Sequence, residues 1–180
     1  MSLLRAVGER LSGAGIRFAL IGGEALALRG ASRATFDRDL LATDPRALSA
    51  TLWQEPVMID ARHEIRLGDE DDPLAGVARF EAPDERDVDL IVGRHPWQER
   101  ILERAEPVDL GDARVALPRV ADLILLKLYA GGPQDLWDVE QLLAASPAEA
   151  IVSEVAGRIA ELPADCAALW RRVHESRRER

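Results

Sequence analysis

The pattern of apolar and polar residues predicts strands and helices in the first two thirds of the chain and helices alone after Pro118. Short apolar or alternating runs typical of strands are "RFALI", "FDRDLLAT", "HEIRLG", "GVARFEA", "DVDLIV" and "ARVAL". Helical spacing occurs in "LLRAVGERL", "GEALALRG", "DPRALSATLWQ" and "HPWQERILERA". We therefore expect an α/β (α+β) sheet domain over residues 1–117 and a C-terminal helical part, packed on it, over residues 118–180.

Local signals locate one helix start and two core positions. Asp44 followed by Pro45 provides an N-cap residue and a first helical residue, which predicts a helix through "DPRALSATLWQ". Trp137 and Trp170 lie in helical segments of the C-terminal part, and we expect both in its core.

The composition is that of a globular protein inside the cell. Hydrophobic residues make up 47% and charged residues 31% of the 180 residues, and no apolar run approaches the roughly 20 residues of a membrane span. The first residues lack the unbroken apolar region of a secretory signal. The single cysteine, Cys166, excludes an internal disulfide and a cysteine zinc site. We expect a cytoplasmic protein with no membrane partner.

The net charge of -9 means that the overall field of the protein does not attract nucleic acid. The tail "RRVHESRRER" is the exception, because it is rich in arginine. These arginines suit the end of a solvated helix, where they oppose the helix dipole. A contact with RNA phosphates is the alternative interpretation of the same tail.

Two strands carry acidic residues in otherwise apolar surroundings. Asp37 and Asp39 are two residues apart on a predicted strand, so their side chains point to the same face. Like charges held close together are costly unless a cation neutralises them, and Mg²⁺ or Mn²⁺ prefers such oxygen ligands. Asp89 supplies a third carboxylate on the apolar strand "DVDLIV", and Asp87 shares its face nearer the strand end. Each acid alone also fits a solvated strand edge or a strand-end cap.

The glycine pair Gly22-Gly23 follows a strand and precedes a helix. Glycines at such a turn allow backbone N–H groups to approach a phosphate, although the dipeptide alone is more typical of a plain tight turn. Carboxylates, metal ions and a phosphate-binding turn together are the parts of a site for nucleotidyl transfer.

These residues resemble a known family. The glycine pair followed by "DRDL" resembles the Gly-Gly/Ser…Asp-x-Asp signature of the DNA polymerase β-like nucleotidyltransferase superfamily. The string "IGGEALALRG" and its continuation to "DRDL" are similar to small bacterial members, namely the abortive-infection (AbiEii-like) toxin nucleotidyltransferases and the antibiotic nucleotidyltransferases. The later block "LPRVADLILLKLYAGGPQDLWDVEQLL" resembles the toxin type. The resemblance covers residues 18–143 and implies a mixed sheet flanked by helices.

The resemblance implies a role for each matching residue in the sheet domain. Asp37, Asp39 and Asp89 would ligate Mg²⁺ or Mn²⁺, and Asp89 would also help to deprotonate the acceptor hydroxyl. The residues that would bind the nucleoside triphosphate, such as ATP, in this part of the chain are Gly22, Gly23, Arg33 and Thr35.

Lys127 and Asp135 are the nucleotide-binding residues that the resemblance implies in the helical part. Asp138 would lie near the site or hold the helices against the sheet domain. Alternatively, Lys127 is a core lysine that extends its amine to water, Asp135 is an N-cap, and Asp138 is a first-turn acid.

Arg38 departs from the family pattern, which has an apolar residue between the two aspartates. Either this face of the strand is partly exposed, or Arg38 pairs with an acid behind the sheet.

The sequence predicts a metal-dependent enzyme that transfers a nucleoside monophosphate from a nucleoside triphosphate to a hydroxyl group. The acceptor is a tRNA or other RNA, a protein side chain or a small molecule. A toxin-like role with an antitoxin partner follows from the resemblance alone. The alternative is a non-catalytic nucleotide-binding or protein-interaction module on the same fold, with Arg38 as its sign.

Overall fold

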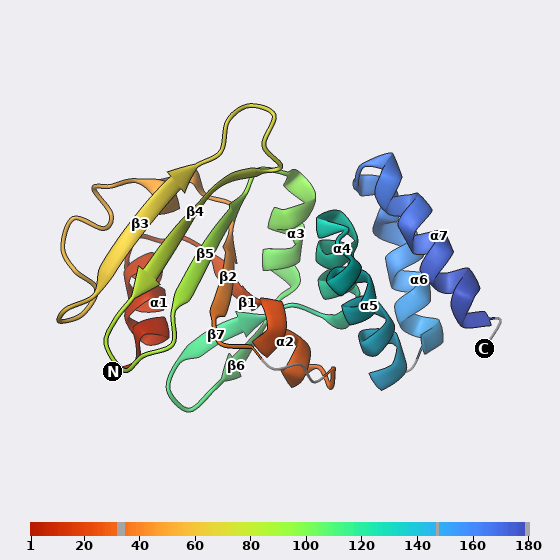
Figure 1. Cartoon of the computed structure of the whole chain (residues 1–180), viewed down its shortest axis with the longest axis horizontal. Coiled ribbons are helices and arrows are strands. Elements are labelled where there is room, and N and C mark those ends of the chain that lie inside the picture. Colours follow the sequence, from red (N-terminus) through yellow and green to blue (C-terminus); the bar gives the residue numbers. More distant parts are fainter. Residues whose placement is uncertain (32–34, 147, 179–180) are drawn as a thin grey trace. The chain divides into compact units, whose positions relative to one another are not determined.

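A computed structural model describes residues 1–31, 35–146 and 148–178 of the chain (Figure 1). The chain forms two compact units. The first contains Met1–Ala25 and Ala34–Pro118, and the second contains Leu26–Arg33 and Arg119–Arg180. The second unit therefore includes a short segment that follows the glycine pair, in addition to the C-terminal helices.

The first unit is built on a mixed five-stranded sheet, which confirms the predicted fold class. Its spatial order is β1-β2-β5-β4-β3, with β2 and β5 parallel and all other neighbours antiparallel. The strands are β1 Phe18–Ile21, β2 Arg38–Ala42, β3 Arg62–Leu67, β4 Leu74–Glu81 and β5 Val88–Gly93. The parallel pair places the beginnings of β2 and β5 beside each other, and these are the segments that carry the aspartates.

Helices and a hairpin complete this unit. The helices α1 Leu3–Gly13 and α3 Pro96–Arg104 belong wholly to it, and α2 Gly22–Leu28 begins in it and continues into the second unit. The hairpin is formed by β6 Glu106–Asp109 and β7 Arg114–Leu117. The sequence pattern predicted β7 but not its partner β6. In Figure 1, α1 passes behind the sheet, and the opposite face of the sheet is turned towards the viewer.

The prediction of a helix through "DPRALSATLWQ" is wrong beyond the first turn. Asp44 does cap the segment by accepting the Arg46 N–H at 2.9 Å, but only the 3₁₀ helix η1, Pro45–Leu48, follows. The chain then turns so that Trp53 enters the core, where its indole N–H donates to the Ala47 carbonyl at 2.8 Å. The centroid of its ring also lies 4.5 Å from that of Phe80. Burial of this large ring outweighs the local helical preference.

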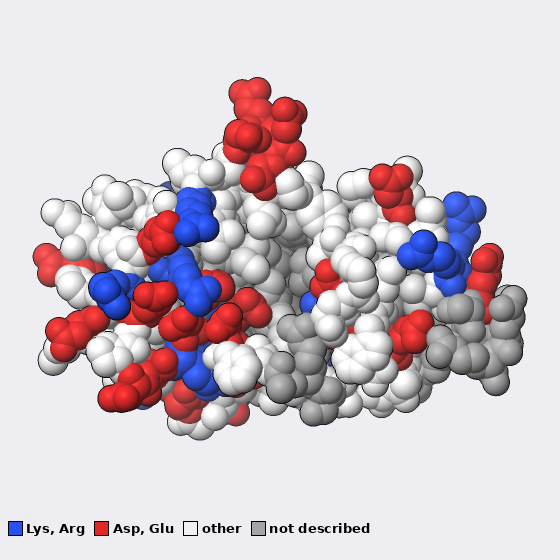
Figure 2. Space-filling view, viewed as in Figure 1, with Lys and Arg blue, Asp and Glu red and all other residues white. Residues whose placement is uncertain are grey.

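The sheet has one apolar and one charged face. Because side chains alternate along a strand, Leu40, Val88, Leu90 and Phe80 share the buried face, and each is 0–1% exposed. The opposite face carries alternating acids and arginines on β3, β4 and β5 (Figure 2). The residues that carry this charge are Glu64, Arg66, Arg79, Glu81, Asp87 and Asp89.

The second unit is helical, as the sequence predicts. It contains α4 Val120–Ala130, α5 Pro133–Ala145, α6 Ala148–Arg158, the 3₁₀ helix η2 Ile159–Glu161 and α7 Ala164–Arg178. Trp170 is buried at 6% exposure, but Trp137 is 43% exposed, so its prediction as a core residue is wrong. Trp137 adjoins the buried Asp138, so the helix turns its indole away from the face that packs. Within the described part of the chain, none of the helices has the length and apolar character that a membrane crossing needs.

Arg38 pairs with two acids on the face of β2 opposite to Asp37 and Asp39. Its Nε lies 3.1 Å from Glu24 Oε2, and its Nη1 forms a short ion pair with Asp112 of the β6–β7 hairpin. The Arg38 side chain is 13% exposed. The expectation that Arg38 pairs with an acid behind the sheet is therefore confirmed. Its ion pairs connect β2 to Glu24 of α2 and to Asp112 of the hairpin.

Replacing Arg38 by Met should lower the free energy of unfolding by about 3 kcal/mol, because Glu24 and Asp112 then lose the cation that compensates them. Urea unfolding followed by circular dichroism measures this change. The matched control is Arg66→Met, since Arg66 pairs with Glu64 but is 78% exposed and should change stability little. Equal effects of the two substitutions would contradict a structural role for the Arg38 ion pairs.

Candidate functional site

The register of the sheet places two of the three predicted acids, Asp39 and Asp89, side by side. Asp39 on β2 is directly beside Ile21 of β1 on one side and Asp89 of β5 on the other. Asp89 is in turn beside Arg79 of β4. Residues in register on neighbouring strands point to the same face, so Asp39, Asp89 and Arg79 line up across the charged face of the sheet.

The glycine pair is required by the side chains that pack against it. A Cβ atom on Gly22 would lie 1.8 Å from Asp39 Oδ2, and Gly22 has a φ of +65°, a conformation that favours glycine. A Cβ atom on Gly23 would lie 2.7 Å from the Thr35 Cβ. The structure therefore brings Gly22, Gly23, Thr35 and Asp39 together, and the two glycines leave room for the other two side chains.

The segment that leads into β2 is fixed by side-chain donors. Thr35 Oγ1 donates to the Asp37 carbonyl at 3.1 Å, and Arg86 Nη2 donates to the same carbonyl at 3.1 Å. Arg86 Nε also donates to the Phe36 carbonyl at 3.2 Å. These bonds fix the backbone of Asp37 at the edge of the row of acids. Arg33, the remaining predicted nucleotide-binding residue of this segment, lies outside the described residues.

Arg79 is the cation of the site, and sequence analysis missed it. Its Nη2 is 2.6 Å from Asp87 Oδ2, its Nη1 is 3.1 Å from Asp89 Oδ2, and its Nε is 3.3 Å from Glu81 Oε1. One guanidinium thus pairs with three carboxylates. The sequence signal that could have identified Arg79 is its place at a polar position of the alternating strand "GVARFEA".

The pKa of Asp89 is raised above its ordinary value. Burial is the largest cause, because it penalises the charged carboxylate. Arg79 acts in the opposite direction and lowers this pKa, whereas the negative charges of Asp37 and Asp87 raise it. Asp37 is therefore close enough to Asp89 to act on it electrostatically.

The donor chemistry of this row suits Mg²⁺ or Mn²⁺, since Asp39 and Asp89 are carboxylates side by side on parallel strands. Among the described residues, however, no group of three His, Cys, Asp or Glu side chains is placed to hold a metal ion. Asp89 is instead paired with Arg79.

Lys127, the only lysine of the chain, pairs with two acids inside the helical unit. Its Nζ lies 2.8 Å from both Asp135 Oδ1 and Asp138 Oδ2. Asp135 also accepts the Gly132 N–H at 3.1 Å at the start of α5, while Asp138 is 1% exposed. Burial acts to lower the pKa of Lys127, but the hydrogen bonds that its ammonium donates to both acids outweigh burial and raise this pKa.

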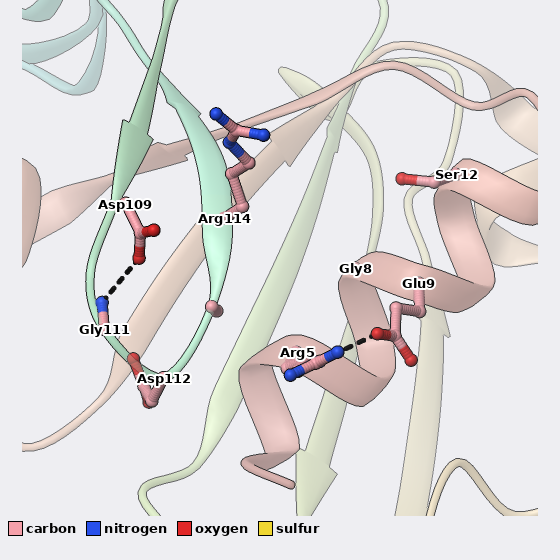
Figure 3. Close-up of a pocket in the computed structure, with 9 residues that line it drawn as sticks. Arg5, Gly8, Glu9, Ser12, Asp109, Gly111, Asp112 and Arg114 are labelled. Carbon is pink, nitrogen blue, oxygen red and sulfur yellow. Dashed lines mark hydrogen bonds and ion pairs between the residues drawn. The ribbon is translucent and has the colours of Figure 1, made fainter.

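A separate cavity of about 460 Å³ lies between α1 and the β6–β7 hairpin (Figure 3). Arg5 and Glu9 of α1 form an ion pair at 2.8 Å at its wall. Asp112, the partner of Arg38, and Arg114 line the side formed by the hairpin. This cavity therefore borders the ion pairs behind β2 and not the row of acids.

Comparison with known proteins shows similarity in structure only. No protein-family model matches the chain, and neither does any curated protein. The crystal structure of ANT(2″)-Ia in complex with adenylyl-2″-tobramycin is 18% identical with a TM-score of 0.55, over 86% of this chain and 94% of that chain. The solution structure of the antibiotic-resistance factor ANT(2″)-Ia is 15% identical with a TM-score of 0.50, over 94% of each chain. The crystal structure of an antigenic nucleotidyltransferase-like protein from Paracoccidioides brasiliensis is 17% identical, with a TM-score of 0.49 over 95% of this chain and 94% of that chain. The fold is that of nucleotidyltransferases, as expected from the sequence.

Asp89→Asn should make the protein at least as stable as the parent at pH 7. A raised folded-state pKa means that the unfolded chain ionises first as the pH rises, so the parent loses stability between the ordinary pKa and the folded-state pKa. At pH 3 the carboxyl is protonated in both states, and the variant and the parent should melt together.

Thermal melts between pH 3 and pH 7 test the sign of this stability difference. Asp44→Asn is the control of opposite sign, because the hydrogen bond from Arg46 holds the pKa of Asp44 below its ordinary value. It should lose stability at pH 7, and the loss should disappear as the pH falls through the folded-state pKa. A large loss at pH 7 for Asp89→Asn would show that the ion pair with Arg79 outweighs the burial of the charge.

Lys127→Met should lower the free energy of unfolding by about 3 kcal/mol, because it leaves the buried Asp138 without its cation. Chemical unfolding monitored by circular dichroism measures the loss. The double variant Lys127→Met/Asp138→Asn should recover part of it, since the uncompensated charge is then removed. A single variant as stable as the parent would mean that these ion pairs do not stabilise the helical unit.

Proposed function

We propose that the protein transfers a nucleoside monophosphate from a nucleoside triphosphate to a hydroxyl group. The observation that carries the proposal is the placement of Asp39 and Asp89 in register on parallel strands, with Asp39 packed on the glycine turn. The fold similarity to nucleotidyltransferases supports it.

The proposed reaction is a single displacement at the α-phosphorus. The acceptor oxygen forms a bond to the α-phosphorus, and the bond from this phosphorus to the bridging oxygen of pyrophosphate breaks. The acceptor proton passes to Asp89, the carboxylate that the family resemblance assigns to this step. Pyrophosphate leaves with the electron pair of the broken bond.

Asp37, Asp39 and Asp89 would hold Mg²⁺ or Mn²⁺. A bound cation polarises the α-phosphate and stabilises the pyrophosphate leaving group. Arg86 and Thr35 contribute by fixing the backbone of Asp37, and Gly22 contributes by allowing the Asp39 carboxylate to pack against the turn.

The proposed nucleotide contacts begin with the glycine turn. Gly22, Gly23 and Thr35 are grouped next to Asp39 and would meet the triphosphate. Arg33, Lys127 and Asp135 are assigned by the family resemblance. Lys127 retains a positive charge, because its pKa is raised by its acidic partners, and this charge suits a polyphosphate.

The acceptor we favour is a small hydroxylated molecule. The support is the similarity to ANT(2″)-Ia, whose structure contains adenylyl-2″-tobramycin. A net charge of -9 also disfavours RNA as the acceptor, since the overall field repels phosphates. Transfer to RNA or protein, and a toxin-like role with an antitoxin, are the other outcomes that the assay below distinguishes.

A non-catalytic nucleotide-binding module is the second candidate. It is favoured by the ion pair between Arg79 and Asp89, and by the lack of a metal-binding group of three acids among the described residues. Such a protein would bind nucleotide without forming a transferred product.

Incubation with each α-³²P-labelled nucleoside triphosphate, Mg²⁺ and a cell extract tests the proposal. Label should appear in a small molecule, and EDTA should abolish this transfer. Asp39→Asn should reduce the transfer at least about a hundredfold, consistent with the loss of a group that stabilises charge in the transition state. Arg66→Gln is the matched control, since Arg66 is exposed on the same face, and it should remain active.

Label in RNA or protein would redirect the acceptor assignment. Nucleotide binding without transfer to any fraction would favour the non-catalytic module.

A further inference from the structure

We propose that Arg79 is an internal cation that occupies the carboxylates when no metal is bound, and that it binds the phosphates of the nucleotide once a divalent cation displaces it. This inference rests on the proposed function. It assigns Arg79 a role in binding a polyphosphate, and it predicts that metal and nucleotide bind cooperatively.

The first support is the geometry of the guanidinium. Each of its three nitrogens meets a different carboxylate, on Asp87, Asp89 and Glu81, at 2.6 Å, 3.1 Å and 3.3 Å. A planar guanidinium that spans three acids supplies in one group the positive charge that the row of carboxylates needs.

The second support is the competition for Asp89. Its Oδ2 lies 3.1 Å from Arg79 Nη1, and its Oδ1 lies 3.4 Å from the same nitrogen. Both carboxylate oxygens therefore face one arginine nitrogen. A divalent cation that binds Asp39 and Asp89 must take over this carboxylate, so binding of the metal alone includes the loss of an ion pair.

The third support is the freedom of Arg79 to move. Its side chain is 39% exposed, whereas that of Arg38 is 13% exposed. A cavity of about 460 Å³ borders its partners Glu81 and Asp87 and is also lined by Asp60 and Arg62. A released guanidinium therefore has open space beside it, and polyphosphate oxygens that enter there offer it bidentate partners in place of the carboxylates.

These contacts couple two ligands. A metal ion releases Arg79, and the released Arg79 then favours the nucleotide, so each ligand should strengthen the binding of the other. Arg79 also weakens the binding of a cation to a site that holds no nucleotide.

The test measures Mn²⁺ binding to the full chain by electron paramagnetic resonance in the absence of nucleotide. Arg79→Gln should bind Mn²⁺ about fivefold more tightly than the parent, the size expected from removing a partly exposed competing ion pair. Arg66→Gln is the matched control, because it removes an arginine of the same face whose partner is Glu64, and it should bind Mn²⁺ as the parent does. Circular dichroism and thermal melts identify any variant that fails to fold.

The second measurement is calorimetry with a non-hydrolysable α,β-methylene ATP analogue at saturating Mn²⁺. Arg79→Gln should bind this analogue about tenfold more weakly than the parent, in line with the loss of a charge-assisted hydrogen bond. Arg79→Lys keeps the charge and should restore much of this affinity. An arginine that is only structural would not produce tighter metal binding together with weaker nucleotide binding.

Unchanged or weaker Mn²⁺ binding by a folded Arg79→Gln would overturn the inference, as would unchanged affinity for the analogue. If the parent transfers nucleotide while the variant shows either of these results, the inference fails and the proposed function stands. If the variant shows both expected shifts but the parent transfers nothing, Arg79 has the proposed role in a protein that binds nucleotide without transferring it.

Discussion

The architecture of the first unit depends on neutralising the carboxylates that a parallel strand pair places side by side. Asp39 and Asp89 are in direct register, and Asp37 and Asp87 add charge on the same face. Such a group is unfavourable without a cation, because neighbouring negative charges repel and burial removes their hydration. Arg79 supplies that cation by contacting three acids with one guanidinium.

The same requirement explains features on both faces of β2. Arg38 faces away from the row of acids and pairs with Glu24 and Asp112, so that these two acids also have a cation beside them. Arg86 links Glu24 to the backbone of Asp37. Positive charge on β4, β2 and the loop before β5 thus holds together a site whose own side chains repel one another.

The fold and part of the site could be predicted from the sequence because they depend on local periodicity. Apolar or alternating runs predicted the five strands of the sheet, and helical spacing predicted the helical unit. Asp39 lies on its predicted strand, whereas β2 begins one residue after Asp37. The prediction of a long helix after Pro45 was wrong because Trp53 packs in the core against Phe80, which is a contact between distant segments. The prediction that Trp137 lies in the core was wrong for a related reason, since α5 buries the face that carries Asp138.

By itself, the sequence determined which chemical groups exist and how they are spaced: a glycine pair, three aspartates on two strands and a single lysine between apolar residues. Only the tertiary structure decided their partners. Strand order and register brought Arg79 to Asp89, the turn brought Gly22 to Asp39, and the meeting of α4 and α5 brought Lys127 to Asp138. The physical reason is that periodicity is a property of neighbouring residues, whereas an ion pair depends on which distant strand or helix packs alongside.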